Sequence, residues 1–159
     1  MTGSVVGSNT GHTGDIRSVG TGFLALRPEP AVCNRLCQVY LRQVDPIIKI
    51  LHRPSLGRFL LDGNSYLGYE EGHFSVEALV SAVCYSAIGS MTEAQCQSMF
   101  HASKSNVGAD YRVACERAVE RAGLITTNDI TVLQAFVLYL VSDEPSDKNV
   151  ACQERNLTQ

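Results

Sequence analysis

The sequence predicts an all-α protein, an irregular bundle of about five to six helices, because apolar residues recur at helical spacing in several separate segments. The stretch Thr92-Glu93-Ala94-Gln95 has the pattern of a capping box, which indicates a helix start. No alternation of apolar and polar residues runs long enough to indicate a sheet. With 159 residues, the chain is long enough for one domain.

The two ends of the chain differ in composition from its middle. Thirteen of the first 22 residues are Gly, Ser or Thr, so residues 1 to 25 are predicted to be a disordered leader that cannot offset its ordering entropy. Residues 143 to 159 are predicted to be a polar tail, in which Pro145 would break a helix. The helical domain is therefore expected at residues 26 to 142.

The domain is predicted to begin with a long helix from Glu29 to Val44, whose apolar residues share one face. Pro46 cannot continue that helix. Asp45 is a good N-cap and Pro46 a good first residue, which predicts a short helix from Pro46 to Leu51. His52-Arg53-Pro54 is predicted to end it.

A glycine-containing loop is predicted over residues 62 to 74. Ser75 is predicted to cap the helix that follows, and Gly89 to end it. Small residues surround the apolar face of this helix, which predicts a central, closely packed position: Ala78, Ser81, Ala82, Cys84 and Ser86.

Three further helices are predicted, from Glu93 to about Ala102, from about Ser103 to Ala122 with Gly123 after it, and from about Asp129 to Val141. Thr127 or Asn128 is expected to start the last one. In the second, a run of charged residues predicts a solvated face: Arg112, Glu116, Arg117, Glu120 and Arg121.

The last predicted helix carries more apolar residues than one surface stripe needs. They stand at positions 130, 132, 133, 136, 137, 140 and 141. Because only a polar tail follows, some apolar surface is expected to stay exposed. We expect that surface to drive self-association or the capture of another helical protein.

The composition excludes some classes of protein. Net charge is −3 and pI about 5.8, so the basic footprint of a self-sufficient nucleic-acid binder is lacking. No apolar run approaches the roughly 18 residues of a membrane span, and the N-terminus has no signal-peptide pattern. The sequence predicts a soluble, intracellular protein without direct sequence-specific DNA binding.

Charge is segregated along the chain. Residues 27 to 59 hold six basic and two acidic residues, and residues 60 to 101 hold five acidic residues and no Lys or Arg. This pattern indicates either a weak nucleic-acid surface or, as we prefer, two differently charged surfaces of a helical domain.

The cysteines predict no metal site. Only Cys33 and Cys37 have the spacing of a zinc-ligand pair, and no second pair follows. We expect no bound cofactor, and reduced, mostly buried thiols at all six positions: Cys33, Cys37, Cys84, Cys96, Cys115 and Cys152.

An enzyme is not predicted. His52, His73 and His101 have no local partner that would make a nucleophile and base pair, and no glycine-rich phosphate loop follows a strand. We therefore assign no catalytic, cofactor-binding or metal-binding residue.

Several segments together resemble a known family. Leu26-Arg27-Pro28, the stretch from Val44 to Pro54 (VDPIIKILHRP) and the helix from Glu77 to Ser90 occur in its order. Further matches are Met91 to Gln97, Tyr111-Arg112, Thr131 to Ala135 and Tyr139 to Val141. Over residues 26 to 142 the chain resembles the first part of the fungal-specific transcription factor domain, the middle homology region of binuclear zinc-cluster regulators.

The resemblance implies an all-helical regulatory region without catalytic residues. The family's six-cysteine zinc cluster, which reads DNA, has no counterpart here, and the match ends at Ser142. It therefore implies a nuclear regulator-like protein that acts through contacts with other regulators or coactivators, or through self-association. The alternatives are a stand-alone helical module that binds a small apolar ligand, or a truncated gene product without independent activity; a cytoplasmic location also stays open.

Overall fold

The computed structural model describes residues 28–143, and within them it is all α, as the sequence predicts. The elements are α1 (Pro30–Val39), the π-helical turn η1 (Tyr40–Val44), α2 (Arg53–Leu60), α3 (Phe74–Ser90), α4 (Glu93–Phe100), α5 (Lys104–Arg121) and α6 (Ile130–Ser142). The predicted leader and all but the first residue of the predicted tail lie outside the described residues.

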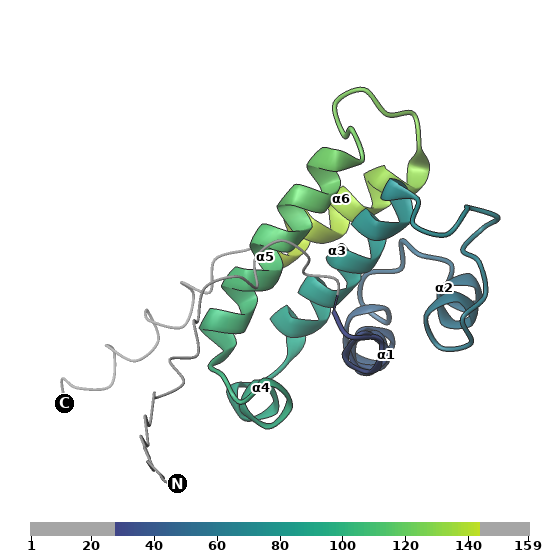
Figure 1. The fold of residues 1–159 in the computed structure, drawn as a ribbon. Coiled ribbons are helices and arrows are strands. Elements are labelled where there is room, and N and C mark those ends of the chain that lie inside the picture. Colours follow the sequence, from purple (N-terminus) through teal and green to yellow (C-terminus); the bar gives the residue numbers. More distant parts are fainter. Residues whose placement is uncertain (1–27, 144–159) are drawn as a thin grey trace, which may run out of the picture.

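Helix α3 lies at the centre of the bundle, which confirms the prediction from its small residues. It packs along α5 and α6 on one side and against α1 and η1 on another (Figure 1). Ala78, Ala82 and Ala87 are fully buried, so neighbouring helices approach its backbone closely. A helix that is apolar around most of its circumference has to be enclosed in this way.

The predicted long first helix ends in a π turn instead of a regular α-helical one. The Asp45 amide donates to the Tyr40 carbonyl at 2.9 Å, five residues back. Tyr40, Leu41 and Val44 of this turn are buried. The Tyr40 hydroxyl is buried as well, and no described residue offers it a hydrogen-bond partner.

The predicted short helix from Pro46 to Leu51 is wrong. Residues 45 to 47 form a turn, and the helix begins seven residues later, at Arg53. Pro54, expected to end a helix, instead lies in the first turn of α2, where its missing N–H costs nothing. Asp45 does not cap a helix. Its carboxylate accepts a hydrogen bond from Arg53 Nη1 at 3.2 Å, and this ion pair joins the end of η1 to the start of α2.

Helix starts are partly different from those predicted. His73, rather than Ser75, caps α3, and its Nδ1 accepts the Ser75 amide at 3.3 Å. Asp129, rather than Thr127 or Asn128, caps α6. The predicted residues stand one or two positions too early, and Thr127 Oγ1 instead accepts the Asp129 amide at 3.0 Å, in the turn before the helix.

The predicted helix ends are correct only in part. Gly123 follows α5 with φ +70°, a left-handed conformation that suits its role as the residue after the C-cap. Gly89, by contrast, does not end α3, which continues to Ser90. Helix α4 ends at Phe100, two residues early, because His101 takes the left-handed conformation. The capping box of Thr92 and Gln95 is present as predicted.

Candidate functional site

Helix α6 has one buried face and one exposed apolar face. Thr131, Val132, Ala135 and Leu138 are fully buried on the side of the bundle. The predicted exposed apolar surface is present on the other side, with exposed fractions of 62% at Ile130, 41% at Leu133, 43% at Val137, 50% at Leu140 and 43% at Val141. We call these five residues the α6 face. Its large apolar side chains make it the first candidate for a contact surface.

Hydrogen bonds fix the start of α6. Asp129 Oδ1 accepts the Thr131 amide at 2.8 Å and the Tyr69 hydroxyl at 2.7 Å. Burial raises the pKa of the Asp129 carboxyl, but hydrogen bonds from Ser75, Tyr69 and Thr131 outweigh it, so that the pKa is lowered overall. The carboxylate therefore stays charged and caps the helix.

The middle and the end of α6 are also tied to the bundle. Gln134 Nε2 donates to the Ile50 carbonyl at 2.7 Å. At the C-terminal end, the Ser86 and Ser142 hydroxyls lie 2.7 Å apart, and the Tyr85 hydroxyl donates to Asp143 Oδ1 at 3.2 Å. These bonds hold α6 in one orientation against the bundle.

A small hollow of about 310 Å³ lies beside the α6 face, between the end of α5, the following loop and α6. Its apolar lining comes from Val119, Leu124, Ile125, Phe136 and Tyr139. Ile125 is 97% exposed at its rim. The hollow is large enough for a small apolar side chain or molecule.

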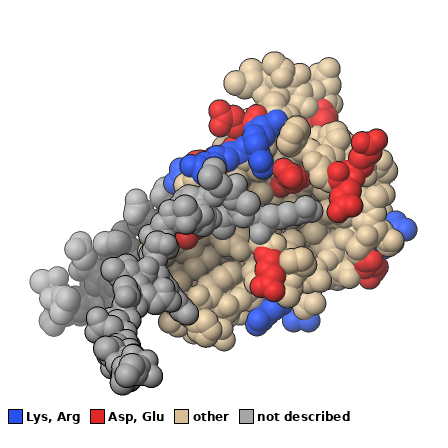
Figure 2. All heavy atoms as spheres, in the orientation of Figure 1, with Lys and Arg blue, Asp and Glu red and all other residues tan. Residues whose placement is uncertain are grey.

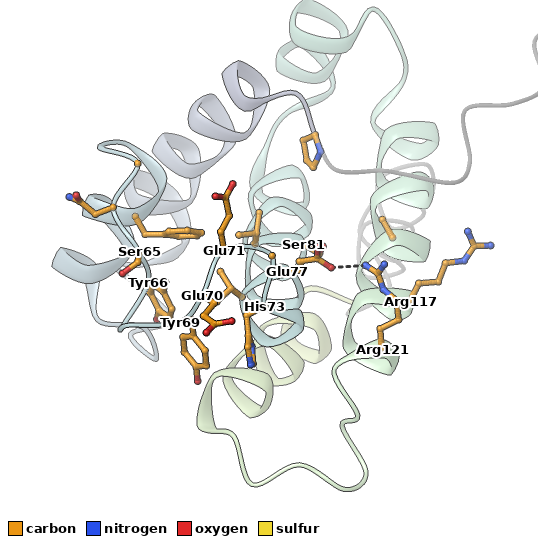
Figure 3. A pocket seen from close by; sticks show the side chains of 18 of the residues that line it. Ser65, Tyr66, Tyr69, Glu70, Glu71, His73, Glu77, Ser81, Arg117 and Arg121 are labelled. Carbon is orange, nitrogen blue, oxygen red and sulfur yellow. Dashed lines mark hydrogen bonds and ion pairs between the residues drawn. The ribbon is translucent and has the colours of Figure 1, made fainter.

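A larger groove of about 860 Å³ lies between the loop before α3, α3 itself and α5 (Figure 3). Arg121 and Glu77 form an ion pair there at 3.1 Å. The groove is lined by four carboxylates, from Glu70, Glu71, Glu77 and Glu120, and by the guanidinium groups of Arg117 and Arg121. Because both signs of charge are present, the groove does not select an anion or a cation by charge alone.

Four cysteines from three helices gather in the core. The pKa of the Cys84 thiol on α3 is raised by a hydrogen bond with Cys33, by burial, and by the proximity of Cys33, Cys37 and Cys115. Burial also raises the pKa of Cys37 and of Cys115 to about 12. Such thiols stay protonated at neutral pH and pack as small hydrophobes.

The sequence predicts buried cysteines, and Cys37, Cys84, Cys96 and Cys115 are buried. It does not predict that those from α1, α3 and α5 meet. The spacing of Cys33 and Cys37 places those two on one helix face. Whether Cys84 and Cys115 lie close to them depends on how α1, α3 and α5 pack. Over residues 28–143, no three His, Cys, Asp or Glu side chains are placed to hold a metal ion. Cys152 lies outside the described residues.

The three candidate histidines all stand at helix ends. His52 precedes α2, and its Nδ1 lies 2.8 Å from Ser55 Oγ. His73 caps α3 through its side chain, and His101 is the C-cap of α4. Each of the three histidines therefore has a structural position at a helix end.

The predicted charged face of α5 is exposed, and Arg112, Glu116 and Arg121 of this face form ion pairs. Arg112 binds Glu116 at 3.1 Å and Asp143 at 3.2 Å. On the face of the molecule shown in Figure 2, Lys and Arg are interspersed with Asp and Glu. That face therefore does not present the continuous basic stripe of a nucleic-acid surface. Among the described helices, none is long and apolar enough to cross a membrane.

Comparison with known proteins finds similar transcription factors. The chain is 63% identical over 122 residues to the C6 finger domain transcription factor adaR of Aspergillus niger, covering 77% of this chain and 16% of that protein. It is 54% identical over 131 residues to the transcription factor vrtR2 of Penicillium aethiopicum, covering 82% and 15%. It is 50% identical over 129 residues to the C6 finger domain transcription factor nscR of Trichophyton verrucosum, covering 79% and 20%.

No family model and no solved structure matches the chain. The similarity covers most of this chain, yet the chain spans only 15–20% of the length of these relatives. The chain is thus similar to one segment of fungal C6 finger transcription factors.

Proposed function

We propose that this chain is a regulatory module of the kind found in C6 finger transcription factors, and that it acts in the nucleus through protein contacts. The observation that carries the proposal is the 63% identity to a segment of such a factor. The α6 face supports the proposed mode of action, since a fixed, exposed apolar surface is typical of a protein contact site.

The proposal assigns this chain neither DNA reading nor catalysis. Its net charge of −3 leaves few phosphates that it could neutralise, so we expect DNA affinity to be weak and lost at physiological salt. The relatives are named as transcription factors, which fits a protein without an active site.

A tethered reporter tests the proposal. The full chain is fused to an unrelated DNA-binding domain in a fungal cell, and transcription from a promoter with the matching site is measured. We expect output to differ from that of the DNA-binding domain alone. Val137→Glu on the α6 face should abolish the difference. Ile47→Glu, a change at a residue that is 81% exposed elsewhere on the surface, should preserve it. Output equal to that of the DNA-binding domain alone would reject the proposal.

A second candidate function is the binding of a small apolar ligand, and the hollow beside the α6 face favours it. A ligand that binds only the folded state raises the melting temperature. We expect 1-naphthol to raise the melting temperature if this function is correct, and Leu124→Trp, which fills the hollow, to remove that rise. A melting temperature independent of 1-naphthol concentration would count against a ligand of this size.

A further inference from the structure

We infer that the groove between α3, α5 and the loop before α3 is a docking site for a segment of this same chain, residues 23 to 27. These residues, Phe-Leu-Ala-Leu-Arg, stand directly before the first described residue, Pro28. Residues 23 to 25 belong to the predicted disordered leader, and the inference assigns them to the helical domain instead. It does not depend on the proposed function, because an intramolecular contact involves no other regulator.

Helix α3 has one uncovered stripe. From Ser75 to Ile88 every residue is buried except Glu77, Val80 and Ser81. The second and third of these stand three and four positions after the first, so all three share one face of the helix. All three line the groove, and Figure 3 shows Glu77 and Ser81 between the tyrosines of the loop and the arginines of α5. Within residues 28–143, the middle of the central helix is therefore covered everywhere except along this stripe.

The lining of the groove suits an apolar occupant. Its apolar part comes from both helices and from the aromatic residues beside them: Phe59, Tyr66, Val76, Val80 and Ala114. Val80 and Ala114 are only partly buried by the described residues. An apolar side chain that covered them would stabilise the fold in proportion to the apolar surface removed from water.

The segment has the matching composition. Residues 23 to 26 are all apolar, and they follow a stretch in which thirteen of 22 residues are Gly, Ser or Thr. Arg27 precedes a proline, which favours an extended backbone at that position. In an extended segment alternate side chains share a side, so Leu24 and Leu26 can enter the groove together.

Tethering favours this segment over a separate partner. Pro28, the next residue, itself lines the groove. The four residues from position 24 to position 28 reach at most about 14 Å when extended. The part of α5 that lines the groove, from Ala114 to Arg121, is about 10 Å long. The segment is thus long enough to cross the groove, and so short a tether gives it an effective concentration in the millimolar range.

The other terminal segment starts farther from the groove. Asp143, the last described residue, contacts Tyr85 and Arg112. Neither of these residues lines the groove, whereas Pro28 does. Residues 144 to 159 would therefore have to close a longer loop before they could cover α3.

The charge of the segment also suits the groove. Carboxylates in the lining outnumber guanidinium groups by four to two, and Arg121 is already paired with Glu77 at 3.1 Å. Arg27 is the only charged residue of the segment. It would enter surroundings in which carboxylates are in excess, which adds electrostatic complementarity to the apolar contact.

Tryptophan fluorescence tests whether the segment is buried. The chain has no tryptophan, so a single one introduced into it reports on its own surroundings. In the full chain, Leu24→Trp should emit at shorter wavelength than the urea-unfolded protein and be quenched less by acrylamide. Val6→Trp, within the Gly, Ser and Thr-rich stretch, is the exposed reference. Emission and quenching of Leu24→Trp equal to those of Val6→Trp would overturn the inference.

A lysine in the groove should release the segment. Combined with Leu24→Trp, Ser81→Lys should shift the emission to that of Val6→Trp. Ser98→Lys, the same change at an exposed position of α4, should leave the emission unchanged. Cooperative thermal unfolding, followed by circular dichroism, checks that both variants fold. A short-wavelength emission that survives Ser81→Lys in a folded protein would show that the segment docks elsewhere.

Photocrosslinking tests the site without altering the groove. Benzoylphenylalanine replaces Leu24 in the full chain, and crosslinked peptides are mapped by mass spectrometry in the monomeric product. We expect crosslinks to the groove-lining parts of α3 or α5. Crosslinks only to other elements, or none within the chain, would overturn the inference. So would crosslinks to α3 or α5 from the same probe at Val150 but not at Leu24, since they would make the C-terminal residues the occupant.

Discussion

At the residue scale, the effect of removing a tyrosine hydroxyl on stability should depend on whether that hydroxyl has a hydrogen-bond partner. The Tyr40 hydroxyl is buried and no described residue binds it, whereas the Tyr69 hydroxyl donates to Asp129 at 2.7 Å. An unsatisfied buried polar group costs about 1–3 kcal/mol. Tyr40→Phe should therefore leave the free energy of unfolding unchanged or raise it, while Tyr69→Phe should lower it by about 1 kcal/mol. Urea unfolding measures both, and a clear loss for Tyr40→Phe would show that its hydroxyl has a partner.

Because Asp129 caps α6, the free energy of unfolding should depend on pH in the acid range. The folded-state pKa of Asp129 lies below its ordinary value of 3.8. The stabilisation it gives is therefore fully present above about pH 4 and is lost as the pH falls through the lower, folded-state pKa. Asp129→Asn should be less stable than the wild type at pH 7, and this gap should narrow below about pH 4.

Unfolding free energies measured from pH 2 to 7 check this prediction. Asp110→Asn, at an exposed position of α5, is the control and should follow the wild type at every pH. A gap between wild type and Asp129→Asn that stays constant with pH would show that the charge of Asp129 is not what stabilises the helix.

At the scale of the element, the two faces of α6 should respond differently to the same substitution. Leu138 is fully buried, and Leu140, two residues later, is half exposed. Leu138→Ala should lower the free energy of unfolding by about 2–5 kcal/mol, as for other buried leucines. Leu140→Ala should lower it by less than about 1 kcal/mol, measured at a concentration where the chain is monomeric. Equal losses would mean that the buried and exposed faces are assigned wrongly.

Helical periodicity predicts the positions of the longer helices well. It does not show which of two prolines begins a helix. Helices α3, α5 and α6 are found close to their predicted positions. The error at residues 46 to 51 has a physical cause: Pro46 and Pro54 both suit the first turn of a helix. The structure uses Pro54, and Asp45 contacts Arg53 at that later start, a contact that no local pattern contains.

The candidate site was predicted only in part. The excess of apolar residues in α6 indicates that some stay exposed, but which ones do depends on the side from which α3 packs. The meeting of Cys33, Cys84 and Cys115 likewise requires the arrangement of α1, α3 and α5. Both features are set by tertiary packing, to which the local sequence gives no direct guide.

At the scale of the whole molecule, the buried thiols should make the protein sensitive to alkali. Burial raises the pKa of Cys37 and Cys115 from about 9 to about 12. Between those values the unfolded chain has lost protons that the folded one retains, so the stability present below about pH 9 falls as the pH rises toward 12. For one thiol the slope is up to about 1.4 kcal/mol per pH unit.

Unfolding free energies between pH 8 and 11 measure this effect. Cys115→Ala should lose stability less steeply with pH than the wild type, because one of the retained protons is removed. Identical slopes in the two proteins would show that Cys115 ionises alike in the folded and unfolded chains.

The π turn after α1 gives the chain a tolerance to changes of length at one point. Because Asp45 bonds to a carbonyl five residues back, this turn holds one residue more than an α-helical turn. Deleting the exposed Arg42 would restore ordinary helical geometry while Asp45 kept its place beside Arg53. A relative that is one residue shorter between positions 40 and 44 is therefore expected to keep the same fold, with an α-helical turn in place of the π turn.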